Sequence, residues 1–221
     1  MYKKQKDRKK RKSLLRYFRL NEGGTDYISI PSLELSGEFN IEMLIYPTDG
    51  KSHIVSDTVG GTRVFIEAAS NKIELTAQSS SSIFDGVVPL NVFSLLCIKR
   101  IAGAISVTVG GVVFPPSASG ADDKTLIINS IGGVWGGATS VPTFIGIQSD
   151  VKITDGSTLI RDYQINDNDN TIRDLVSGQD GSVINGNADD WGLFKEQPTL
   201  WKGQDLTVPP WDSVDQELIK A

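Results

Sequence analysis

The sequence predicts an all-β protein built as a two-sheet antiparallel jelly-roll sandwich. Short runs that alternate apolar and polar residues recur roughly every ten residues. Such alternation places one face of each strand in a core and the other in water. Glycine pairs and Asn or Asp residues separate the runs, as the turns of hairpins require. Because no helical pattern alternates with the strands, a parallel α/β sheet is not expected.

The clearest predicted strand is 39–45, in which Phe39, Ile41, Met43 and Ile45 share one face. Further strands are predicted at 63–67, 72–75, 93–98, 105–109, 126–128, 144–147, 151–153 and 159–163. The inward faces give a predicted core of Ile28, Ile30, Phe39, Ile41, Met43, Ile45, Val64, Ile66, Ile73, Leu75, Leu96, Ile98, Ile105, Val107, Val109, Ile145, Ile147, Val151 and Ile153.

The composition narrows the function classes. Of the 221 residues, 39% are apolar and 22% are charged, which is typical of a globular protein. One cysteine, Cys97, excludes an internal disulfide framework, and one histidine, His53, excludes a metal site with several histidines. No apolar run reaches the roughly 18 residues of a membrane-spanning helix, and the basic N-terminus lacks the apolar stretch of a signal peptide.

Charge is strongly segregated along the chain. Residues 1–12 contain eight Lys or Arg and one Asp, a net charge of +7; since the whole chain carries −5, the rest carries −12. We divide the chain into a basic arm (1–19), a jelly-roll domain (20–194) and a C-terminal extension with a short helix (195–221). The arm is either a solvated tail or an electrostatic anchor for an acidic partner. The anchoring residues would be Lys3, Lys4, Lys6, Arg8, Lys9, Lys10, Arg11 and Lys12.

The C-terminal extension contains Trp201 and Trp211 in an otherwise polar stretch. These side chains either fill gaps on the body of the domain or dock on a neighbouring subunit, because tryptophan suits both roles.

The order of several motifs resembles the laminin-G-like, concanavalin-A-like lectin/glucanase superfamily. The motifs are DYISIP at 26–31, FNIEMLIYP at 39–47, ISVTVGG at 105–111 and FIGIQSDVKI at 144–153. The closing segment 167–186, followed by Trp191, is similar to laminin-G-like modules in structural proteins of tailed bacteriophages. This resemblance implies a concanavalin-A-like fold and a role as a virion component, in a tail, a fibre or a capsid decoration.

The residues argue against catalysis. Glycosidases of this superfamily carry the pattern E-x-D-x-x-E on one strand, and no such run is present. Glu42, Glu67 and Glu74 are interpreted as outward-facing residues of half-buried strands. A serine-hydrolase triad would need His53, which lies in the loop-like stretch 49–53 and has no nucleophile motif beside it. We therefore expect a protein that is not an enzyme.

The sequence offers two candidate ligand sites and leaves an alternative interpretation for each. Asp167 and Asp169 lie in an oxygen-rich run that suits calcium, but such residues also form tight turns, and no cofactor is required. Trp135, flanked by glycines, is either a platform for a host glycan or a side chain packed in the core.

The favoured hypothesis is a non-enzymatic bacteriophage structural protein, located in the virion and anchored through its termini to virion proteins with acidic surfaces. A homo-oligomer within an assembly is expected, and nucleic acid would be contacted only through the arm. The alternative is a carbohydrate-binding module for host surface glycans.

Overall fold

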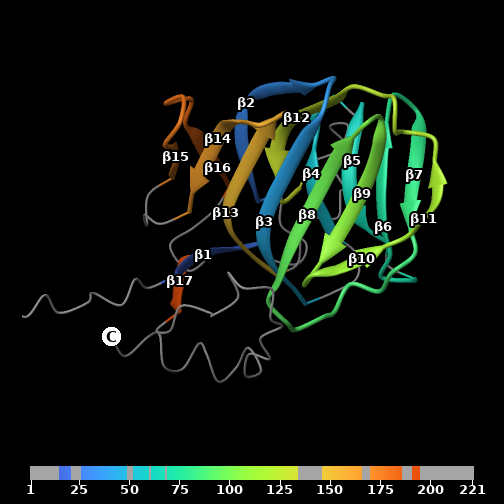
Figure 1. The fold of residues 1–221 in the computed structure, drawn as a ribbon. Coiled ribbons are helices and arrows are strands. Elements are labelled where there is room, and N and C mark those ends of the chain that lie inside the picture. Colours follow the sequence, from blue (N-terminus) through green and yellow to red (C-terminus); the bar gives the residue numbers. More distant parts are fainter. Residues whose placement is uncertain are drawn as a thin grey trace, which may run out of the picture.

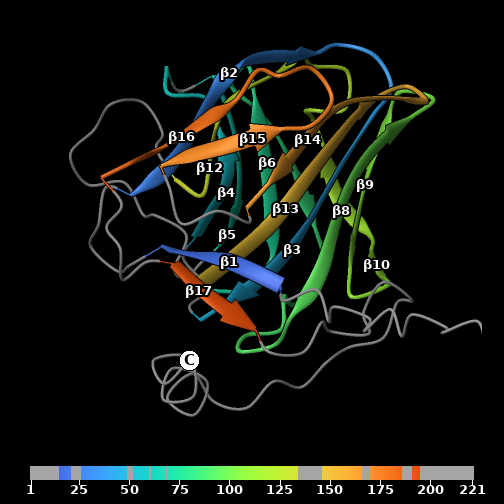
Figure 2. The same cartoon turned by 90° about the vertical axis from the view of Figure 1, so that its left-hand side faces the viewer.

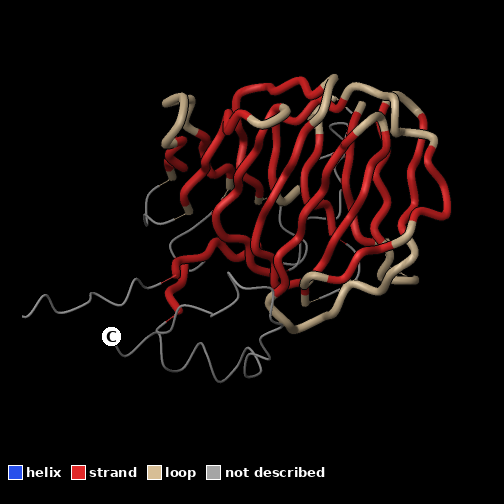
Figure 3. The backbone as a smooth tube through the Cα atoms, viewed as in Figure 1, coloured by secondary structure: helices blue, strands red, loops and turns tan. Residues whose placement is uncertain are grey.

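The computed structural model describes residues 15–20, 26–48, 52–59, 61–67, 69–133, 146–165, 170–185 and 191–194. Strands and loops make up these residues, and no helix occurs among them (Figure 3). The part of the chain so described therefore contains no helix that could cross a membrane. The predicted all-β fold class is confirmed.

One layer of the fold, sheet A, is antiparallel throughout. Its strands, in spatial order, are β14 (Thr158–Gln164), β13 (Gly146–Asp155), β3 (Phe39–Pro47), β8 (Ser94–Ile101), β9 (Ala104–Val109) and β10 (Val112–Phe114). At the lower end of the sandwich, β1 (Leu15–Leu20) pairs with both β13 and β17 (Trp191–Phe194) (Figure 1). Strand β1 therefore begins within the segment assigned to the arm.

The second layer, sheet B, is also antiparallel. Its strands, in spatial order, are β16 (Gly181–Ile184), β2 (Tyr27–Leu35), β12 (Leu126–Ile131), β4 (Ser52–Ser56), β5 (Thr62–Ile66), β6 (Ile73–Ala77), β7 (Ser80–Phe84) and β11 (Pro116–Ser119). Figure 1 shows sheet A in front of sheet B, and Figure 2 shows the two layers from the side, with β4 and β12 to the left of β3 and β8. Strand β15 (Thr171–Asp174) pairs with β14 of sheet A and β16 of sheet B, and so closes one side of the sandwich.

The inward faces of the two sheets form one apolar core. Every residue of the predicted core whose side chain is described is buried, from Ile28 on β2 to Ile153 on β13. Ile145 lies outside the described residues, and the side chain of Ile147 is not described. Full burial of each large aliphatic side chain contributes about 1.5–3 kcal/mol, so the core can hold the sandwich together without disulfides.

The structure also corrects details of the predicted strands. Residues 146–147 of one predicted run and the whole run 151–153 belong to one strand, β13, which is interrupted by a bulge at Asp150, where φ is 33°. Strand β7 was not predicted because its sequence, SSSIF, has three serines and little apolar alternation. Strand β4 was missed as well, since turn-forming residues precede it.

Candidate functional site: the outer face of sheet B

A row of polar side chains crosses the outer face of sheet B. Its members are paired in register from strand to strand, and five of the seven positions are serines. The buried neighbours Val55, Val64 and Leu75 point into the core, so the adjacent residues of the row point outward. From β16 to β7 the row is Ser182, Ser29, Ser130, Ser56, Arg63, Thr76 and Ser81.

The centre of this row is covered by the chain itself. Ser56 and Ser130 are both fully buried, and each donates a hydrogen bond to the carbonyl oxygen of Gly133, at 2.8 and 3.0 Å. The amide of Gly132 donates to the carbonyl oxygen of Ile54 at 2.8 Å, which holds the same turn against β4. The row is therefore divided into two accessible parts, one at β16 and β2, where Ser182 is exposed, and one over strands β5, β6 and β7.

On the second of these parts, five side chains form what we call the β5–β7 cluster: Arg63, Phe65, Glu74, Thr76 and Ser81. The Arg63 guanidinium carbon lies 4.6 Å from the centre of the Phe65 ring, which is a cation–π distance. Arg63 Nε donates to Thr76 Oγ1 at 3.4 Å. Both hydroxyl groups donate to one oxygen of the carboxylate, Glu74 Oε1, from Thr76 at 3.2 Å and from Ser81 at 2.9 Å. All five residues are half-buried, so they are held in place yet remain open to solvent.

His53 borders this cluster. It lies within strand β4, which corrects its prediction as part of a loop-like stretch. The centres of its ring and of the Phe65 ring lie 5.7 Å apart in an edge-to-face arrangement, and no described residue makes a hydrogen bond to its Nδ1. Burial, with a smaller effect of the Arg63 charge, lowers the pKa of His53 to about 4, so the imidazole is neutral at pH 7.

The outer face of sheet A carries a different polar group. The Asn40 side-chain amide donates to Glu42 Oε1 at 2.7 Å, and the Cys97 thiol donates to Asn40 Oδ1 at 3.0 Å. Burial is the main cause that raises the pKa of Cys97 to about 11, so this thiol is not an activated nucleophile. Glu42 and Glu74 are both outward-facing, as predicted, but they lie on opposite faces of the sandwich. They cannot flank one glycosidic bond.

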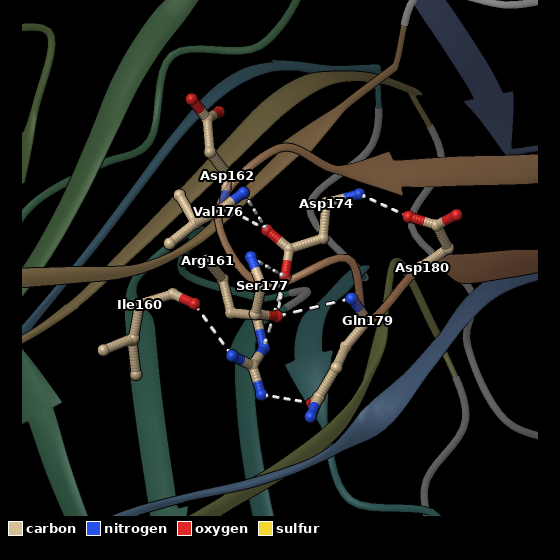
Figure 4. Close-up of polar contacts among 8 residues, drawn as sticks. All are labelled: Ile160, Arg161, Asp162, Asp174, Val176, Ser177, Gln179 and Asp180. Carbon is tan, nitrogen blue, oxygen red and sulfur yellow. Dashed lines mark hydrogen bonds and ion pairs between the residues drawn. The ribbon is translucent and has the colours of Figure 1, made fainter.

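A third polar group, drawn in Figure 4, joins β14 to the loop between β15 and β16. Asp174 Oδ1 accepts from the amides of Asp162 and Val176 at 3.0 and 3.1 Å, and the Ser177 hydroxyl donates to Asp174 Oδ2. Burial alone would raise the pKa of Asp174, but these hydrogen bonds outweigh it and the pKa is lowered. Arg161 lies 3.7 Å from Asp174 and donates to Gln179 at 2.5 Å. These contacts hold the loop between β15 and β16 against β14.

Every site residue predicted from the sequence lies outside the described residues. These are the basic residues of the arm (Lys3, Lys4, Lys6, Arg8, Lys9, Lys10, Arg11 and Lys12), Trp135, Trp201 and Trp211, and the calcium candidates Asp167 and Asp169. The short helix predicted in the extension lies outside them too. Where side chains are described, no group of three or more His, Cys, Asp or Glu residues is arranged to hold a metal ion.

No protein-family model and no curated protein matches the chain. Among solved structures, it is similar to a protein from Bacteroides ovatus ATCC 8483 named a putative carbohydrate binding protein. The sequence identity is 17%, the TM-score is 0.60, and the match covers 84% of this chain and 61% of that protein. The chain thus spans less than two thirds of that protein's length. The likeness shows a lectin-like β-sandwich fold.

A second similar structure is the native heptameric SAP-like pentraxin from Limulus polyphemus. It has 12% identity and a TM-score of 0.47, and the match covers 65% of this chain and 76% of that chain. A match at this level supports no argument about assembly, and the homo-oligomer stays a prediction. Neither name is that of a bacteriophage protein, and the virion role stays a prediction as well.

Proposed function

We propose that this chain is a non-enzymatic carbohydrate-binding domain whose ligand binds at the β5–β7 cluster. The observation that carries the proposal is the composition of that cluster. A guanidinium that rests on an aromatic ring stands beside a carboxylate and two hydroxyl groups, on three adjacent strands. Sugars present many groups that both donate and accept hydrogen bonds, so their sites combine fixed donors with fixed acceptors.

The rigidity of the cluster supports the same function. The Phe65 ring and the Thr76 hydroxyl hold Arg63 from two directions, and a continuous ladder pairs β5 with β6 and β6 with β7. A ligand that binds to groups already in place does not have to order them, which improves affinity. The name of the Bacteroides protein agrees with this proposal, although the likeness itself shows only the fold.

The absence of catalysis is part of the proposal. Glycoside hydrolysis requires two carboxyl groups on either side of the scissile bond. Among the described residues, Glu74 is the only carboxylate in the hydrogen-bond network of the cluster. Glu67, at the end of β5, accepts hydrogen bonds from Ala69 and Ser70 in its own turn instead. We expect a bound oligosaccharide to be released unchanged.

A glycan array probed with the full-length chain tests the proposal, followed by calorimetry on the glycans that bind. Arg63→Ala should weaken binding at least about tenfold, because it removes a charged donor. Lys99→Ala removes a cation from the outer face of sheet A and should leave affinity unchanged. An array on which no glycan binds, or equal losses in the two variants, would overturn the proposal.

The segregation of charge favours a second candidate function, attachment of the domain to a virion through residues 1–12. The arm would bind acidic surfaces of neighbouring virion proteins, and this binding would weaken as salt rises. Deletion of residues 1–12 should abolish incorporation into particles while the β-sandwich still folds. Normal incorporation of the truncated chain would exclude the arm as the anchor.

A further inference from the structure

We infer that His53 is a positioning residue of the β5–β7 cluster, and that the cluster binds its ligand only while the His53 imidazole is neutral. The inference rests on the proposed function, because it assigns a further residue to the same site. It depends on the contacts that link His53 to Arg63 through the Phe65 ring, and on the burial of an imidazole nitrogen that has no hydrogen-bond partner among the described residues.

His53 and Phe65 are direct partners in the β4–β5 ladder. Both side chains lie on the outer face of sheet B, because Val64 and Ile66, on either side of Phe65, point into the core. The centres of the two rings are 5.7 Å apart and their planes make an angle of 69°, which is the edge-to-face geometry that aromatic pairs favour. Arg63 lies over the same Phe65 ring. The imidazole is therefore one of the groups that hold Phe65, and Phe65 in turn holds Arg63.

The surroundings of the imidazole suit a neutral ring only. His53 is 3% exposed, and no described residue makes a hydrogen bond to its Nδ1. A neutral imidazole has one N–H group, whereas a protonated imidazole has an N–H group on both nitrogens and a positive charge. Burial of that charge together with an unsatisfied N–H group is strongly unfavourable. A protonated His53 therefore has to leave its place against Phe65 and turn toward water.

The two strands paired with β4 carry no acidic residue. These strands are β5 and β12, and the only charged side chain on them is that of Arg63. Burial and, to a smaller extent, this charge hold the pKa of His53 at about 4. The acidic residue of the cluster, Glu74, lies one strand farther on, on β6, and accepts hydrogen bonds from Thr76 and Ser81. Strands β5 and β12 therefore offer no salt bridge that would keep a protonated His53 in place.

Ligand binding and protonation of His53 should therefore exclude each other. When the imidazole leaves, the Phe65 ring loses one of its contacts and Arg63 loses its fixed position. A ligand then has to order both side chains again, which weakens its affinity. Because such coupling is reciprocal, a bound ligand should also lower the pKa of His53 below about 4. The site would thus release its ligand under acidic conditions.

The test measures the affinity for the tightest-binding glycan of the array between pH 7 and pH 3.5, by calorimetry, on the full-length chain and on two variants. His53→Phe keeps an aromatic ring against Phe65 and cannot take up a proton. It should match the unaltered chain at pH 7 and bind about fourfold more tightly than the unaltered chain at pH 3.5, which is below the His53 pKa of about 4. His53→Ala removes the contact and should weaken binding at pH 7 by about two- to tenfold.

The comparison of the unaltered chain with His53→Phe isolates the effect of His53. Titration of Glu74 or of the glycan affects both chains alike, so the ratio of the two affinities reports on His53 alone. Circular dichroism at each pH checks that the β-sandwich stays folded. Equal pH profiles of the two chains overturn the inference and leave the proposed function standing.

NMR spectra of the unaltered chain give a readout that needs no variant. Saturation with the glycan should move the titration midpoint of the His53 C2 proton to lower pH, and a midpoint that stays in place overturns the inference. Without glycan, the Phe65 ring signals should shift with the same midpoint as that proton. An array on which no glycan binds is instead the failure of the proposed function. In that case, Phe65 signals that do not follow the His53 titration still overturn the inference.

Discussion

The guanidinium carbon of Arg100 lies 4.9 Å from the centre of the Phe39 ring, its partner in the β3–β8 ladder. Arg100 is buried at the end of sheet A, where it donates to the carbonyl oxygens of Leu35, Ser36 and Gly37 at 3.2–3.4 Å. It also donates to the carbonyl oxygen of Lys124, which precedes β12. Arg100, on sheet A, thus holds in place the segment that follows β2 and the segment that precedes β12, and both of these strands belong to sheet B.

This arrangement predicts a large loss of stability for Arg100→Met. Methionine keeps the length of the side chain but leaves several carbonyl oxygens without their donor, which should destabilise the fold by about 2–4 kcal/mol. Urea unfolding followed by circular dichroism measures the change. Lys99→Met, on the outer face of the same strand, should change the stability by less than about 0.5 kcal/mol. Equal effects of the two substitutions would contradict the role given to Arg100.

A second prediction concerns the close approach of β16 to β2. A Cβ atom on Gly181 would lie 2.9 Å from the carbonyl oxygen of Ser29 and 3.1 Å from Ile30 Cγ2. The first of these is a backbone atom in a paired strand, so it cannot move aside cheaply. Gly181→Ala should therefore destabilise the protein by about 1–3 kcal/mol. The matched control is Gly37→Ala, because no atom lies within 4 Å of a Cβ built there. A thermal melt in which the two variants coincide would refute the prediction.

Much of the sandwich could be predicted from the alternation of apolar and polar residues alone. In β3, β5 and β9 every second position is buried, and nearly all of those positions are apolar. The same pattern places Arg63 and Glu74 on an outer face, because their neighbours Val64 and Leu75 belong to the predicted core. Local sequence thus fixes which face a residue occupies.

The candidate site itself could not be predicted, because it depends on register between strands. Thr76 meets Ser81 only because β7 pairs with β6, and the serines of β7 carry no strand signal. Ser56 and Ser130 are 74 positions apart, and their contact depends on the β4–β12 pairing. The burial of His53 also depends on strand pairing, between β4 and β5, and it could not be predicted because the local sequence is typical of a loop. The sequence gives the residue types of the cluster, but it does not show which of them contact one another.

A third prediction follows from the lowered pKa of Asp174. A carboxylate whose pKa is lower in the folded than in the unfolded state stabilises the fold above its ordinary pKa of 3.8. That contribution is lost as the pH falls through the folded value. Asp174→Asn should cost about 1–3 kcal/mol at pH 7, because the amide cannot accept all of the same hydrogen bonds.

The pH dependence of the stability difference shows whether the charge of Asp174 or only its packing is responsible. In urea titrations, the gap between Asp174→Asn and the unaltered chain should narrow as the pH drops below 3.8. The matched control is Asp155→Asn at an exposed position, which should change the stability at pH 7 by less than about 0.5 kcal/mol. A gap that stayed constant from pH 7 to pH 2.5 would show that the charge of Asp174 is not involved.

The last prediction concerns His53, which is the only histidine in the chain. Its pKa of about 4 lies below the value of 6.5 expected in the unfolded chain, so the unfolded state binds a proton first as the pH falls. Stability is therefore full above pH 6.5 and declines between pH 6.5 and pH 4, by about 3 kcal/mol from this group. The imidazole C2 proton should titrate near pH 4 in an NMR spectrum, without any need for assignment. His53→Leu should flatten the stability profile between pH 6.5 and pH 4 relative to the unaltered chain. A midpoint near 6.5 in the folded protein would mean that the imidazole is open to water, and the cluster would then border a charged group under mildly acidic conditions.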